Sequence, residues 1–235
     1  MRFRSTFAAA VLVGIPVLVA ACGGGGTSTS GRTTSTSAPR TAPTARAVPS
    51  TVPASPPTST AVWPTTLSGT RYATPVAAAQ GFATSYLHLA GPVAGTFQQG
   101  SAGSGQVPIQ ATGTGPVTTV AVRQLGSDQS WWVTGSSTPD IRLTQPTSGA
   151  LVSSPVTMRG SAQAFEGVVK TQVREDGNTQ PIGEGVVNAG MAMTPFTGSV
   201  AYSAASTKYG ALVLFTVSAK DGSVVEASVI RLRLG

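Results

Sequence analysis

Apolar and polar residues alternate with a period of two through the C-terminal part of the chain. Near its end, Ile230, Leu232 and Leu234 alternate with two arginines. Neighbouring residues of a strand point to opposite faces, so this period indicates strands that have one face in a core. The same alternation predicts further strands at 141–144, 156–163, 169–174 and 196–203.

Turn sequences such as Asp176-Gly177 and Asp221-Gly222 separate these runs. Short strands at regular spacing predict a β-sandwich over residues 139–235. The run Ala211 to Val217 is apolar at both parities. We expect one parity in the core and Leu212 and Leu214 on the outside, where they are candidates for contact with the preceding module or with a partner.

Residues 63–138 combine a helical pattern with strand-like runs. Thr74 is a suitable N-cap, Pro75 fits the first helical position, and apolar residues recur at helical spacing as far as Ala90. Gly91-Pro92 is expected to end the helix. The strand-like runs are 106–111, 117–125 and 130–134. These elements predict a small α+β module in which one helix covers an antiparallel sheet.

Trp131 and Trp132 are adjacent in the last of these strands. Because they must point to opposite faces, one can enter the core of the module while the other faces away. The second ring is then either covered by the helix or the next domain, or exposed as a platform for a sugar or a protein partner.

An apolar run without strand alternation lies at the N-terminus, from Phe7 to Ala20, after Arg2 and Arg4. A bilayer span needs about 20 apolar residues, so the run is typical of a secretory signal peptide, here residues 1–21. Val19-Ala20-Ala21-Cys22 resembles the lipobox of bacterial lipoproteins. That resemblance implies a diacylglyceryl group on Cys22 and an anchor on the extracytoplasmic side of the cell membrane. The alternative is an ordinary signal peptide followed by an unmodified thiol.

Residues 22–62 follow as a linker. Thr and Ser make up 17 of the 40 residues from 23 to 62, and six more are Pro. Such a segment buries too little apolar surface to offset the entropy lost on ordering, so we predict a disordered linker. Its composition also resembles that of O-glycosylated stalks.

The net charge of +7 is unevenly distributed. Residues 1–71 hold six arginines and no acid, whereas residues 72–235 hold nine basic and eight acidic residues. The excess positive charge therefore belongs to the signal peptide and the linker, where anionic lipids or wall polymers are nearby. We expect no nucleic-acid partner.

Several motifs of residues 140–235 resemble one family. The most specific is the run from Ala162 to Gly167, Ala-Gln-Ala-Phe-Glu-Gly, together with Gln145-Pro146 and Asp221-Gly222. The chain is similar here to the immunoglobulin-like domain associated with bacterial spore germination. The resemblance implies a seven-stranded sandwich in exported or anchored proteins and implies no catalysis. Within the run, Glu166 is either a ligand or metal contact, or a carboxylate that accepts hydrogen bonds at a strand turn.

Chemistry-bearing motifs are sparse. The chain has no Gly-x-Ser-x-Gly elbow and no phosphate-binding glycine loop, and His88 is its only histidine. No acidic cluster has metal-ligand spacing, so we expect no metal, no cofactor and no enzyme activity. The predicted function is a non-catalytic interaction module that binds an envelope protein. A glycan or peptidoglycan binder using Trp131 or Trp132 is the alternative, and a hydrolase built around His88 is a third.

Overall fold

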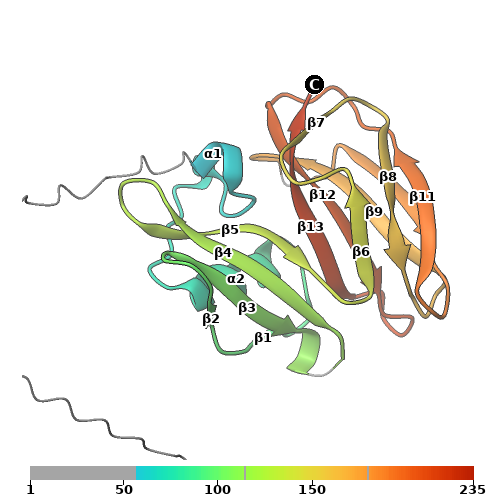
Figure 1. Cartoon of the computed structure of the whole chain (residues 1–235), viewed down its shortest axis with the longest axis horizontal. Helices are drawn as coiled ribbons and strands as arrows, with labels where there is room; N and C mark the ends of the chain where they lie inside the picture. Colours follow the sequence, from blue (N-terminus) through green and yellow to red (C-terminus); the bar gives the residue numbers. More distant parts are fainter. Residues whose placement is uncertain (1–56, 114, 179) are drawn as a thin grey trace, which may run out of the picture. The chain divides into compact units, whose positions relative to one another are not determined.

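The computed structural model describes residues 57–235 except 114 and 179 (Figure 1). The described residues belong to one compact unit. The signal peptide, Cys22 and most of the linker lie outside the described residues. The helices are α1 (Pro57–Thr60) and α2 (Pro75–Ser85), with the 3-10 turns η1 (Thr66–Ser68) and η2 (Ala111–Gly113).

Most of the described chain outside these helices is β-structure, as the sequence predicts. The strands are β1 (Val93–Ala94), β2 (Gln98–Gln99), β3 (Ser104–Gln110), β4 (Val117–Leu125), β5 (Ser130–Ser137), β6 (Ile141–Gln145), β7 (Ala150–Val152), β8 (Val156–Ala162), β9 (Val168–Glu175), β10 (Gly183–Asn188), β11 (Thr194–Val200), β12 (Tyr209–Val217) and β13 (Val224–Leu234).

Helix α2 begins where its capping sequence predicts. The Thr74 side chain accepts a hydrogen bond of 3.2 Å from the Ala77 N–H, and Pro75 is the first helical residue. The helix ends at Ser85, earlier than the predicted Ala90. His88 then takes a left-handed conformation, with φ of 57°, and its side chain is exposed.

The described residues include 57–62, which precede the predicted boundary at residue 63. Val62 is only 2% exposed, and its N–H donates to the Val133 carbonyl of β5 at 2.8 Å. The last residues assigned to the linker are therefore ordered. Pairing with β5 satisfies the backbone of this segment, which composition alone could not reveal.

Two sheets build the structure. The larger has the order β1-β3-β4-β5-β13-β12-β9-β10, and the smaller has the order β11-β8-β6 (Figure 1). In the C-terminal part, β13, β12, β9 and β10 face the smaller sheet, and residues such as Met158, Val169 and Leu232 fill the core between them. This arrangement is the predicted sandwich of antiparallel sheets.

Strand β5 of the N-terminal module pairs with β13 of the sandwich. Ser136 lies opposite Val229, and the Ser136 hydroxyl donates to the Ala227 carbonyl at 2.8 Å. Gly135 permits this approach, because a Cβ at that position would lie 2.6 Å from the Val229 carbonyl oxygen. One sheet therefore continues through both parts of the chain.

Strand β12 is buried on both faces. Leu212 and Leu214 are fully buried in the core of the sandwich, so the prediction that they face outward is wrong. Ala211, Val213 and Phe215 occupy the other face and belong to the core under α2. The alternation correctly assigns these residues to the two faces of β12. Because both faces are apolar, however, the sequence of the strand does not indicate which core each face enters.

Candidate functional site

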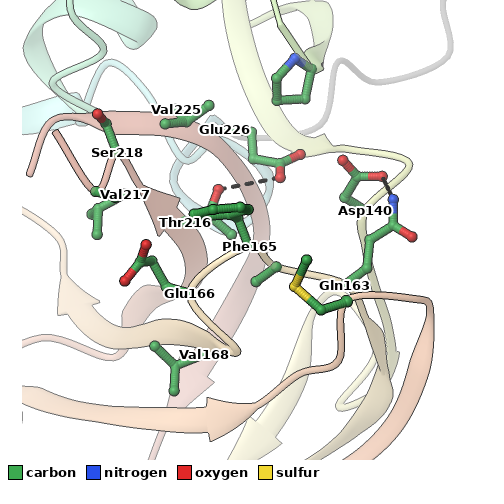
Figure 2. Close-up of a pocket in the computed structure, with 14 residues that line it drawn as sticks. Asp140, Gln163, Phe165, Glu166, Val168, Thr216, Val217, Ser218, Val225 and Glu226 are labelled. Atoms are coloured by element: carbon green, nitrogen blue, oxygen red, sulfur yellow. Dashed lines mark hydrogen bonds between the residues drawn. The ribbon is translucent and has the colours of Figure 1, made fainter.

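A cavity of about 470 Å³ opens at one end of the sandwich (Figure 2). Its walls come from the turn after β8, the end of β12 and the start of β13, and Pro116 of the N-terminal module also lines it. The run of residues that resembles the spore-germination domain supplies the turn. The cavity is therefore built from segments that only the tertiary structure brings together.

Backbone hydrogen bonds hold the turn after β8 in place. The Ala164 N–H donates to the Gly190 carbonyl at 2.9 Å, and the Ala189 N–H donates to the Gly167 carbonyl at 2.8 Å. Gly167 has φ of 70°, a conformation that favours glycine, and its N–H closes the turn on Ala164. The turn and the 189–191 segment thus form one braced surface.

Two large apolar side chains project from this surface. Phe165 is 80% exposed and Met191 is 75% exposed, and both line the cavity. Their backbones come from the two segments that the hydrogen bonds join. Single exposed apolar residues are ordinary, but two on adjoining braced segments beside a cavity are typical of a binding surface.

Glu226 lies at the buried side of the cavity and is only 3% exposed. Its carboxylate accepts hydrogen bonds from the hydroxyls of Thr138 and Thr216, the latter at 3.2 Å (Figure 2). Burial raises the pKa of Glu226 above its usual value, and the nearby Asp140 carboxylate raises that pKa further. Asp140 accepts from the Gln163 amide at 2.7 Å.

Glu166 is exposed at the rim of the same cavity (Figure 2). Within the described part of the chain, its carboxylate has no hydrogen bond that would give it the role of closing the turn; Gly167 and Ala164 close the turn through their backbones. Among residues 57–235 as described, no group of three or more His, Cys, Asp or Glu could hold a metal ion.

The two tryptophans lie away from this cavity. Trp132 is 1% exposed and packs with Leu125. The Cζ atom of Arg71 lies over the Trp132 ring, 4.9 Å from the ring centroid. Trp131 is half-buried and makes an edge contact of 5.4 Å with Phe97. Trp132 therefore offers no open face for a sugar ring, and the side chain of Phe97 partly covers Trp131.

Sequence reasoning singled out Glu166 but missed the other cavity residues. Phe165 is predicted only as part of the motif from Ala162 to Gly167, and the motif does not indicate that its ring is exposed. Asp140 lies directly before β6, where the local sequence does not indicate a cavity. The sequence around Glu226 does not indicate that β13 places this residue in the cavity.

The fold and the cavity define a mainly β protein whose C-terminal part is an immunoglobulin-like sandwich. Residues 140–223 match the family described as the immunoglobulin-like domain of bacterial spore germination, which confirms the resemblance for this part of the chain. No curated protein and no solved structure matches the chain. Among the described helices, none is long and apolar enough to cross a membrane. The matched domain is consistent with a non-catalytic interaction module.

Proposed function

We propose that this protein is a lipid-anchored, surface-exposed interaction module of the cell envelope, which binds a protein partner through the cavity end of its sandwich. The observation that carries the proposal is the exposure of Phe165 and Met191 on two braced segments. The match of residues 140–223 to an immunoglobulin-like domain supports a binding role.

The exposed apolar side chains at the cavity favour binding. When a partner covers such side chains and removes them from water, the free energy of the complex falls by about 25 cal/mol per Å² of apolar surface buried. Aromatic residues and methionine are enriched at interfaces, and the flexible thioether of Met191 can adapt to a partner's shape. Because hydrogen bonds already hold the supporting backbone, little ordering would be needed on binding.

The anchor is supported by the N-terminal sequence. Lipidation of Cys22 would attach the chain by two or more acyl chains, and each buried methylene contributes about 0.8 kcal/mol. The Thr/Ser/Pro-rich linker would then separate the folded part from the membrane. The 34 residues from 23 to 56 would reach roughly 105 Å if they were extended throughout at ~3.1 Å per residue.

Site-specific photocrosslinking in intact cells tests the partner. A benzophenone amino acid is placed at Phe165 or Met191, and a control is placed at Val93, which is 53% exposed on β1. We expect one discrete adduct from the first two positions and none from Val93. Equal labelling from all three positions, or no adduct from the first two, would contradict the proposed binding surface.

Membrane fractionation tests the anchor separately. Cys22→Ala should leave the folded part intact and either release the protein from the membrane or stop its processing. Metabolic labelling with a clickable fatty acid should mark the wild type and leave the variant unmarked. If the variant is processed and retained like the wild type, Cys22 is not the anchor.

A further inference from the structure

We infer that the cavity at the end of the sandwich binds a basic side chain, lysine or arginine, of a polypeptide partner, with Phe165 and Met191 packing against the apolar residues beside it. This inference rests on the proposed function, since it specifies the chemistry of the partner at the same surface. It goes further by naming the group that must enter the cavity.

The charges of the cavity wall favour a cation. Asp140, Glu166 and Glu226 line it, and no Lys, Arg or His is among the described residues that do so. A partner that brings an anion would meet like charges, and a purely apolar partner would bury carboxylates without a counter-charge. A basic group avoids both costs.

The carboxylates also have acceptor capacity left for such a group. An ionised carboxylate offers about four lone-pair positions. Among the residues that the structure describes, Glu226 has two hydroxyl donors, and Asp140 has the Gln163 amide as its side-chain donor with no second one. An ammonium or guanidinium group supplies several N–H donors at once, so it can complete both carboxylates.

The surroundings distinguish a basic side chain from a bare metal ion. The described residues hold no cluster able to ligate a metal, because the three carboxylates are not grouped as ligands. Phe165, Met191 and Val217 line the cavity together with the carboxylates. Lysine and arginine carry long apolar stems under a charged end, which suits a cavity lined by both apolar side chains and carboxylates.

The raised pKa of Glu226 agrees with this geometry. Burial is its main cause, and the Asp140 carboxylate adds to it. Burial removes water from the carboxylate, and the Asp140 charge repels the charged form of Glu226. A basic group in the cavity would oppose them, so binding should lower the pKa of Glu226 and release protons near that pKa.

Fluorescence anisotropy of the full chain in a neutral detergent tests the inference. The probes are short labelled peptides that differ at one central position: Leu-Lys-Leu, Leu-Gln-Leu and Leu-Glu-Leu. A hydrogen-bonded charge contributes enough that the lysine peptide should bind at least about tenfold more tightly than the glutamine peptide. The glutamate peptide should bind most weakly.

Variants then locate the binding. Glu166→Gln and Asp140→Asn should each remove most of the preference for lysine over glutamine. Glu184→Gln is the matched control, because Glu184 is an exposed acid on β10 outside the cavity. It should keep the full preference. Circular dichroism confirms that all three variants remain folded.

Four results would overturn the inference. One is equal binding of the lysine and glutamine peptides while crosslinking at Phe165 still succeeds, which would leave the proposed function standing without a basic ligand. Another is no binding of any peptide. A third is binding of the lysine peptide only after Arg32, Arg40 and Arg46 are changed to glutamine, because the occupant would then be this chain's own linker. The last is a dimer that Glu166→Gln dissociates, because the occupant would then be a second copy.

Discussion

The two ends of β13 hold buried charges in different surroundings. Towards its C-terminal end, Arg231 is 2% exposed and forms two parallel bonds of 2.6 Å with the carboxylate of Asp176. Its guanidinium also donates to the carbonyls of Gly210 and Thr58. Near the other end, Glu226 is buried beside a cavity, and its side-chain partners are two hydroxyl groups.

The difference separates a structural charge from one that is available to a ligand. The charges of Arg231 and Asp176 neutralise each other. Through its hydrogen bond to the Thr58 carbonyl, Arg231 also holds the segment around Thr58 against the sandwich. Glu226 is stabilised by hydrogen bonds while its negative charge stays unneutralised by a cation of its own cavity. Removing the charge of Arg231 should therefore destabilise the protein, whereas removing the charge of Glu226 should stabilise it at neutral pH.

The largest effect is expected for Arg231→Met. This change leaves Asp176, whose side chain is 15% exposed, without its partner. Breaking a largely buried pair by removing one member costs about 3–5 kcal/mol of the free energy of unfolding. Urea denaturation measures it. Arg233→Met is the control on the same strand: Arg233 is exposed, and we expect a change within about 0.5 kcal/mol. Equal losses in the free energy of unfolding from the two variants would contradict the structural role of the Arg231–Asp176 pair.

A smaller loss is expected for Thr138→Val at the cavity end. Thr138 is 5% exposed and donates to Glu226. Leaving that buried acceptor short of a donor costs about 1–3 kcal/mol, mainly at a pH where Glu226 is ionised. The exposed Thr157 on β8 provides the control, Thr157→Val. If Thr138→Val is as stable as the control at neutral pH, the hydroxyl is not holding the carboxylate.

Glu226→Gln should have the opposite sign at neutral pH. The folded state raises the pKa of Glu226, so the native protein binds the proton more tightly than the unfolded chain does. Wild-type stability should therefore fall as the pH rises from about 4.5, the usual value, through the raised pKa, and then level off. The glutamine variant should lack this part of the decline. Parallel pH profiles for the two proteins, from urea midpoints at each pH, would contradict the assigned pKa shift.

The smallest effect on stability is expected for Phe165→Ala. Its ring is 80% exposed, so the free energy of unfolding should change by less than about 0.5 kcal/mol. Phe196→Ala, at a residue 7% exposed in the sandwich core, should cost about 3–5 kcal/mol. Thermal denaturation compares the two. A large loss from Phe165→Ala would mean that this ring is structural and not held ready for a partner.

Local elements could be predicted from short stretches of residues. The period-two alternation located β6, β8, β9, β11 and the end of β13, but it predicted neither β7 nor β10. In the N-terminal module, β4 spans the predicted residues 117–125. Thr74 and Pro75 placed the start of α2, because capping depends only on neighbouring residues. The run from Ala162 to Gly167 identified the kind of domain, which the family match confirmed.

Contacts between distant segments assign each surface to a core or to a site. Leu212 and Leu214 turned inward because β12 is covered on both faces, and a strand's own sequence cannot name its neighbours. Glu226 and Asp140 line the same cavity as Glu166 through the pairing of strands far apart in the chain. Likewise, the pairing of β5 with β13 depends on Gly135 approaching Val229. Contacts between distant segments form only when the whole sheet assembles, which is why the cavity could not be predicted from the residues alone.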